Sequence, residues 1–258
     1  MAEDYSDHLL ALVEHDLLPS SYEAVFVAGS VVQGWGNTGS DIDIYVICDE
    51  APSGVVSAHR VGLQPDAVAV SQLTTNDHKL DIEYWQDGQV DQLLDKVSWK
   101  EFYSSDVSGD RLSWPELRLL ERVDHAVPLA GAGWLERRRE QTRSTAIRSL
   151  MVSRALNYTT LFIEDAIGQL ESGDVESAVL SARLAFGNVI DALLAGEGKY
   201  GQSGKWRARR FRAVEQDVIS FEDYWAIETM QDFQPDEPAI WVRRVVTTCR
   251  QIARQVVV

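Results

Sequence analysis

One short stretch constrains the fold of this chain more than any other. It begins with a Gly29-Ser30 turn and ends in an acidic–apolar–acidic segment that contains Asp41 and Asp43. Side chains alternate between the two faces of a strand, so Asp41 and Asp43 project together from one face and the apolar residues from the other. Residues 24–28 form an apolar run directly before the turn. The pattern therefore predicts two strands joined by a glycine-rich loop.

The residue types in this stretch favour a site for metal and phosphate. Two carboxylates on one face of a strand repel each other unless a cation lies between them. Mg²⁺ prefers oxygen ligands and is commonly held by one or two carboxylates together with substrate phosphates. The Gly29-Ser30 turn can offer backbone N–H groups and a hydroxyl to those phosphates. The alternative interpretation of the same residues is a solvated edge strand after a glycine-rich loop.

The stretch resembles the motif of the polymerase-beta-type nucleotidyltransferase superfamily. That motif consists of a Gly-Ser or Gly-Gly turn, a spacer of the length found here over residues 31–40, and an acidic–apolar–acidic strand. The resemblance implies that Asp41 and Asp43 are catalytic metal ligands. It also implies a nucleotide site that includes Gly29, Ser30 and Ser40.

A later segment, residues 79–85, alternates cleanly between apolar and polar side chains and predicts a further strand. The superfamily places a third carboxylate on such a strand, and Asp81 matches that position. Two metal ions about 3.5–4 Å apart need several bridging oxygens, which a third acid helps to supply. Glu83 lies on the same predicted face as Asp81. It is a candidate metal neighbour or general base, or else a solvated strand residue.

Composition bounds the class of protein. The chain has 258 residues, of which 45% are hydrophobic, enough for one large domain or two modest ones. It has no apolar run long enough to predict a membrane span. Its two cysteines, Cys48 and Cys249, are far apart and suggest neither a disulfide framework nor a zinc site. We therefore expect a cytoplasmic protein.

The charge is distributed unevenly. Residues 1–130 contain 7 Lys/Arg and 23 Asp/Glu, whereas residues 131–258 contain 17 of each. Long nucleic acids are held by many contacts between Lys or Arg and phosphate, so an acidic catalytic half argues against a polymerase. Negative potential concentrates cations, which suits a small cationic acceptor. Surface solubility explains the same charge equally well.

Hydrophobic periodicity predicts an α+β chain with two parts. The first, residues 1–130, contains strands and helices, and the resemblance implies that it is the nucleotidyltransferase catalytic domain with a mixed sheet. The second, residues 131–258, is predicted to be an all-α helical bundle, and the resemblance implies that it binds acceptor and nucleotide. The predicted strands cover residues 24–28, 41–47, 68–73 and 79–85. The predicted helices cover residues 9–17, 115–123, 135–170, 175–194, 221–230 and 239–255, with a domain junction at 125–133.

An α/β catalytic half followed by a helical half is similar to the aminoglycoside nucleotidyltransferases. Relatives there carry a glycine-rich turn and then a lysine that reaches the triphosphate, and Lys205 is the matching residue. A lysine is a compact charge suited to phosphate oxygens. Asp191 and Asp165 lie on the long helices of this half and are candidates for acceptor binding; ordinary solvent-facing acids are the alternative.

These features lead to a functional hypothesis. We expect a nucleotidyltransferase that moves a nucleoside monophosphate, with ATP as the expected donor, to a hydroxyl of a small amine such as an aminoglycoside-like antibiotic. The resemblance implies two Mg²⁺ ions and the release of pyrophosphate. One alternative is an antitoxin-type enzyme that modifies a partner protein or tRNA. Another is a nucleotide-binding module without turnover.

Overall fold

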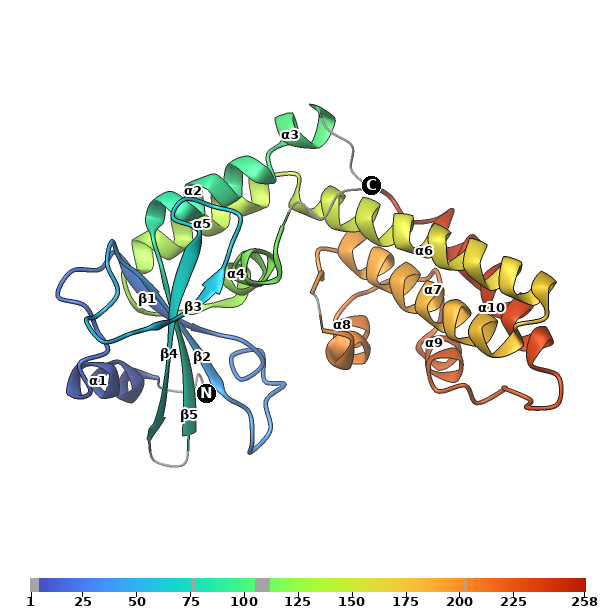
Figure 1. The fold of residues 1–258 in the computed structure, drawn as a ribbon, viewed down its shortest axis with the longest axis horizontal. Helices are drawn as coiled ribbons and strands as arrows, with labels where there is room; N and C mark the ends of the chain where they lie inside the picture. Colours follow the sequence, from blue (N-terminus) through green and yellow to red (C-terminus); the bar gives the residue numbers. More distant parts are fainter. Residues whose placement is uncertain (1–4, 76–77, 105–111, 202) are drawn as a thin grey trace. The chain divides into compact units, whose positions relative to one another are not determined.

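The computed structural model describes residues 5–75, 78–104, 112–201 and 203–258. These residues form two compact units (Figure 1). The first carries a sheet and extends to Thr145, and the second is helical and begins at Ala146. The predicted fold class, a mixed sheet with helices followed by a helical region, is confirmed.

The described part of the first unit contains a six-stranded sheet in the order β3-β4-β5-β2-β1-β6. Strands β2 and β5 are parallel, and the other neighbouring strands are antiparallel. The interior strands β2 and β1 are short and almost wholly buried. The strands are β1 (Ala24–Ala28), β2 (Ile42–Ile47), β3 (Ser57–Arg60), β4 (Ala67–Thr75), β5 (His78–Trp85) and β6 (Val127–Ala130).

One face of the sheet is covered by α1 (Ser6–Glu14), the opening helix that the apolar periodicity predicts. Leu12 of this helix is fully buried in a cluster with alternate residues of the central strands, among them Ile44 and Ile82. The hydroxyl of Tyr84 on β5 donates to the carbonyl of Leu17 at 2.8 Å. These contacts leave the opposite face of β2 and β5 for the acidic side chains.

The other face carries α2 (Asp87–Lys96), α4 (Trp114–His125) and α5 (Ala132–Ser144), while α3 (Trp99–Ser104) follows α2. Phe26 of β1 stacks on Tyr45 of β2 and on Trp134 of α5. The indole N–H of Trp134 donates to Asp87 at the start of α2, at 2.7 Å. Figure 1 shows α2 and α5 running side by side.

Helix α4 is fixed by a buried carboxylate at its first turn. Ser113 and Glu116 form a capping box, and Pro115 lies in the first turn, where a missing N–H costs nothing. Glu116 is fully buried and accepts from the backbone of Gly62 at 2.8 Å and from Lys96 at 2.9 Å. The position of α4 matters because two of its arginines reach the sheet.

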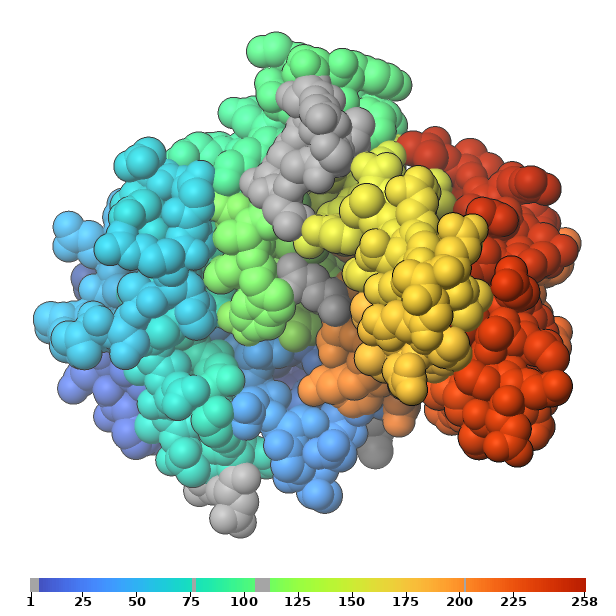
Figure 2. All heavy atoms as spheres, turned by 45° about the vertical axis from the view of Figure 1, so that its right-hand side comes forward, coloured from blue at the N-terminus to red at the C-terminus, as the bar shows by residue number. Residues whose placement is uncertain are grey.

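The second unit is built around two long helices, α6 (Ile147–Ser172) and α7 (Val175–Gly196), with α10 (Pro238–Ala253) packed beside both. Figure 2 shows the atoms of α6 and α10 adjoining each other, in agreement with the contacts between these two helices. By length and composition α7 is apolar enough to cross a membrane, but 72% of its most apolar window is buried as a core helix of this unit. The shorter elements are η1 (Gly204–Trp206), α8 (Arg207–Arg212) and α9 (Phe221–Glu228).

The prediction of one helix over residues 135–170 is wrong, because the structure has α5 and α6 with a break between them. Thr145 is extended, with φ −80° and ψ 175°. The hydroxyls of Ser144 and Thr145 donate to the carbonyls of Gln141 and Thr142, both at 2.7 Å, and such bonds compete with continued helix. Strands β3 and β6 were also missed, since both are short edge strands without clear alternation.

Candidate active site

The centre of the candidate site is a pair of aspartates on neighbouring parallel strands. In the register of β2 and β5, Asp43 lies directly beside Asp81. Asp43 also pairs with Ala28 of β1, so the Gly29-Ser30 turn begins beside it. The two carboxylates converge on one face because both strands alternate in the same phase.

Gly29 is required by the close approach of Asp43. Its φ is +95°, a conformation that side chains rarely adopt. A Cβ atom placed on Gly29 would overlap Oδ2 of Asp43. The glycine of the turn therefore leaves room for the carboxylate, which gives a physical reason for the Gly-Ser and Asp-x-Asp elements to occur together.

A lysine that the sequence motif does not include lies among these acids. Nζ of Lys79 is 3.0 Å from Oδ2 of Asp41 and 3.2 Å from Oδ1 of Asp81. The side-chain amide of Gln72, opposite Asp81 on β4, donates to the same Oδ1 at 2.8 Å. The two carboxylates together raise the pKa of Lys79, so its ammonium stays protonated. We call Asp41, Asp43 and Asp81 the acid cluster.

Two arginines from α4 bring further positive charge to the same face. Arg118 and Arg122 are four residues apart and therefore lie on one side of the helix. Nη2 of Arg122 is 3.2 Å from Oδ2 of Asp43, and Arg118 forms an ion pair with Glu83. Burial raises the pKa of Asp43 above its ordinary value, while Arg122 opposes that rise. Asp43 is thus a largely buried carboxylate with one cationic partner.

Glu83 occupies the predicted strand face but differs from Asp81 in its surroundings. Glu83 is only 6% exposed. Its carboxylate forms an ion pair with Arg118 and accepts a hydrogen bond from the indole N–H of Trp85, with a nitrogen–oxygen distance of 2.9 Å. A carboxylate with two fixed donors in a buried position has little freedom to take up a substrate proton. These contacts favour a structural role, and the general-base role stays a prediction.

The donor chemistry of the acid cluster fits Mg²⁺, which prefers carboxylate oxygens. The ammonium of Lys79 occupies a cation position between Asp41 and Asp81. In the described ranges no group of three or more His, Cys, Asp or Glu side chains is arranged to hold a metal ion as it stands. The carboxylates of the acid cluster are therefore suitable Mg²⁺ ligands, but their oxygens are paired with the side chains of Lys79 and Arg122.

The loop between Gly29 and β2 is closed by its own hydrogen bonds. Backbone N–H groups of Trp35 and Gly36 donate to the carbonyl of Ser30 at 2.8 and 3.0 Å. The hydroxyl of Ser40 accepts from the backbone of Asn37 at 2.9 Å. The predicted phosphate contacts of Ser30 and Ser40 stay predictions.

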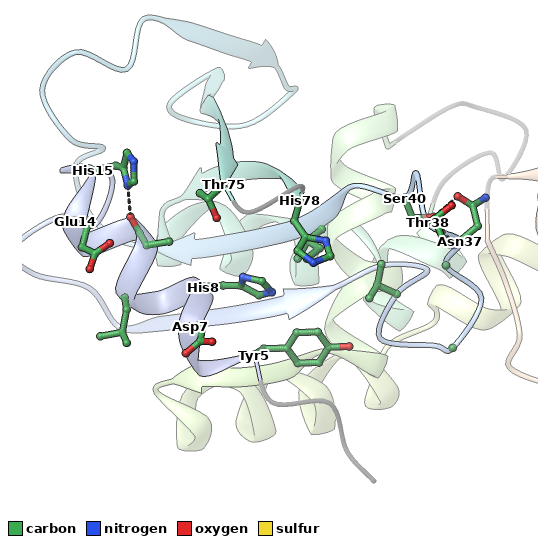
Figure 3. Close-up of a pocket in the computed structure, with 16 residues that line it drawn as sticks. Tyr5, Asp7, His8, Glu14, His15, Asn37, Thr38, Ser40, Thr75 and His78 are labelled. Carbon is green, nitrogen blue, oxygen red and sulfur yellow. Dashed lines mark hydrogen bonds between the residues drawn. The ribbon is translucent and has the colours of Figure 1, made fainter.

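A cavity of about 980 Å³ lies between this loop, α1 and the start of β5 (Figure 3). Ser40 and Ile42 line it, as do His8 and His78, whose rings meet edge to face with centroids 6.2 Å apart. Because Ile42 points to the α1 face, this cavity lies on the other side of β2 from Asp43.

The predicted residues of the helical unit have very different surroundings. The carboxylate of Asp191 on α7 accepts hydrogen bonds from Arg207, at 2.8 and 3.1 Å, and from Arg210, at 3.1 Å. Arg207 also lies 3.4 Å from Glu228. We call these four residues the helical ion network. Its arginines satisfy Asp191, so the contacts favour a structural role over the predicted acceptor binding.

Lys205 and Asp165 are both exposed. Lys205 is in η1, with its ammonium 5.2 Å from the ring centroid of Trp206, and Asp165 is on the outer surface of α6. Their predicted roles in phosphate and acceptor binding stay predictions.

Sequence reasoning missed Lys79, Gln72 and the two α4 arginines as parts of the site. Lys79 was detectable, because it precedes Asp81 by two residues and so shares its strand face. The spacing of Arg118 and Arg122 places them on one helix side, but only the packing of α4 decides that this side meets the sheet.

Comparison with known proteins supports the fold assignment at the level of structure. No protein-family profile matches the chain, and no curated protein sequence matches it either. Its fold is nucleotidyltransferase-like. This chain is similar to a crystal structure described as a nucleotidyltransferase-like protein from Exiguobacterium sibiricum, with a TM-score of 0.50 and 8% sequence identity. The alignment covers 98% of this chain and 75% of the Exiguobacterium chain. At that identity the likeness concerns the fold alone.

Proposed function

We propose that this protein is a metal-dependent nucleotidyltransferase that transfers a nucleoside monophosphate to a hydroxyl group and releases pyrophosphate. One observation carries the proposal: Asp43 and Asp81 lie side by side on β2 and β5, next to a Gly29 turn that leaves room for Asp43. A nucleotidyltransferase-like fold supports the same conclusion. The nucleotide donor is proposed to be ATP, and the assay described below tests the other nucleoside triphosphates as well.

The position of each residue in the site indicates the role that we propose for it. Asp41, Asp43 and Asp81 would hold Mg²⁺, and Gly29 and Ser30 begin the loop that would face the phosphates. Bound magnesium would neutralise charge on the attacking and leaving oxygens. Arg122 holds the carboxylate of Asp43 at 3.2 Å and so fixes its orientation. Cytoplasmic location, where nucleoside triphosphate is available, is part of the proposal.

The acceptor is proposed to be a small hydroxylated amine, such as an aminoglycoside-like compound. The acidic first 130 residues support this choice, because negative potential attracts a cationic acceptor. Asp165 and Asp191 remain candidates for acceptor binding in the second unit, although the pairing of Asp191 with two arginines weakens its case. Lys205 remains a candidate for binding the triphosphate.

A second candidate function is a nucleotide-binding module without turnover. The specific observation in its favour is that Lys79 and Arg122 already neutralise part of the acid cluster. A permanently neutralised cluster would bind nucleotide without metal-dependent chemistry.

A pyrophosphate-release assay separates the two functions. The protein is incubated with Mg²⁺, each nucleoside triphosphate and a panel of hydroxylated amines. The enzyme hypothesis expects pyrophosphate release that falls by at least about 100-fold in Asp43→Asn. Nucleotide binding by calorimetry should partly survive in that variant. Nucleotide binding without pyrophosphate release under any acceptor would support the module and contradict the enzyme.

A further inference from the structure

The ammonium of Lys79 is placed where a cation of the acid cluster would be expected. Lys79 and Asp81 share one face of β5, and the parallel register brings the start of β2, which Asp41 directly precedes, alongside them. Nζ lies 3.0 Å from Asp41 and 3.2 Å from Asp81, so one positive charge bridges acids from two segments. Without it, the two carboxylates would meet across adjacent strands and repel each other.

The two cations of the acid cluster differ in how firmly they are held. Arg122 extends from α4, and its side chain is 18% exposed. The Lys79 side chain is 42% exposed and stands on a flexible four-carbon stem. Exposed ion pairs of this kind contribute little stability and exchange partners readily. Lys79 is therefore the cation that can leave the acids, whereas Arg122 is anchored.

We propose that Lys79 is a built-in counter-cation of Asp41 and Asp81, which a divalent metal ion must displace in order to bind. The inference rests on the proposed function, since metal-dependent chemistry gives these acids an ion to hold. Lys79 then acts as a positioning residue that lowers the affinity of the free protein for metal. Once displaced, its ammonium is available to phosphate oxygens, to which lysine binds as a point charge.

The test measures metal binding directly and needs no turnover. Free Mn²⁺ is titrated into the full chain without nucleotide, and the unbound ion is quantified by electron paramagnetic resonance. Lys79→Met removes the competing charge and should tighten Mn²⁺ binding by about tenfold, as expected for one charge lost a few ångströms from the ion in a solvated setting. Lys79→Arg keeps a cation and should bind Mn²⁺ as weakly as the natural protein.

Lys100→Met is the matched control, because Lys100 is exposed on α3 and the variant has the same net charge as Lys79→Met. Its Mn²⁺ affinity should change by less than about twofold, since exposed distant charges are screened. Circular dichroism checks that every variant is folded, and Lys79→Gln replaces Lys79→Met if the latter does not fold.

The proposal is overturned if the Lys79 variant binds Mn²⁺ no more tightly than Lys100→Met, or if none of the proteins binds Mn²⁺. Pyrophosphate release by the natural protein is measured in parallel. Release without any Mn²⁺ effect of the Lys79 substitution would reject the counter-cation and leave the nucleotidyltransferase intact. Tighter Mn²⁺ binding without pyrophosphate release would support the counter-cation and reject the enzyme.

Discussion

The aspartates of the acid cluster in the first unit and Asp191 of the helical ion network in the second are all paired with cationic side chains, but in different surroundings. In the helical ion network, Asp191 is fixed by three nitrogen–oxygen contacts, and the side chain of Arg210 is only 4% exposed. In the acid cluster, Asp41 is 41% exposed, and its partner Lys79 is 42% exposed. The first arrangement holds helices together, and the second leaves Asp41 and Asp81 accessible to an incoming ion, whereas Asp43 is largely buried beside Arg122.

The difference teaches how to separate structural from ligand-binding carboxylates. A buried ion pair has fixed geometry, and removal of one partner leaves the other charge without compensation. An exposed pair is weak and exchangeable. Whether a carboxylate lies on a long helix or on a strand does not predict if it is structural or ligand-binding. The number and the burial of its cationic partners do predict this. Three substitutions can break or sharpen this comparison.

The largest expected effect on stability follows removal of the carboxylate from the helical ion network. Asp191→Ala leaves Arg210 buried without its carboxylate and should lower the free energy of unfolding by about 3 kcal/mol. Urea denaturation followed by circular dichroism measures the change. Asp165→Ala on exposed α6 is the control and should stay within about 0.5 kcal/mol. Unchanged stability in Asp191→Ala would reopen its predicted acceptor role.

A smaller effect is expected at the turn beside Asp43. Gly29→Ala strains a backbone with φ +95° and drives a Cβ atom into Asp43, so it should cost about 2 kcal/mol and reduce pyrophosphate release. Gly34→Ala is the control. Gly34 has φ +67° but no atom within 4 Å of an added Cβ, so that variant should cost about 1 kcal/mol and leave Asp43 in place.

If Gly34→Ala reduced pyrophosphate release as much as Gly29→Ala, the overlap with Asp43 would not be the cause. Thermal denaturation and the pyrophosphate assay on both variants decide between the two explanations.

The smallest expected effect tests Glu83, which lies beside the acid cluster but has partners like those of the helical ion network. Glu83→Gln keeps an acceptor for Trp85 and removes the charge facing Arg118, so it should cost about 1.5 kcal/mol. Glu50→Gln, on an exposed residue, is the control. Loss of pyrophosphate release at unchanged stability would show that Glu83 is catalytic and not structural.

Much of the fold could be predicted because its signals are local. The strand 24–28 is an uninterrupted apolar run, and residues 79–85 alternate with a period of two; both form strands where expected. The helix 135–170 was predicted wrongly because residues 136–145 are polar and contain no glycine or proline, so no local signal marks a break before Ile147. The break depends on hydroxyl–carbonyl bonds and on α5 packing with the sheet, which a periodic pattern does not encode.

The sequence by itself determined that Asp43 lies on the strand face opposite the apolar residues and that a glycine turn precedes it, because strand alternation is a property of the local backbone. Asp41 directly precedes β2, which begins at Ile42. Only the tertiary structure decided that Asp81 lies beside Asp43, that Lys79 bridges two acids, and that Glu83 and Asp191 are held by arginines. Those partners come from different strands and helices. Pairing between distant segments depends on strand register and helix packing, which no local pattern specifies.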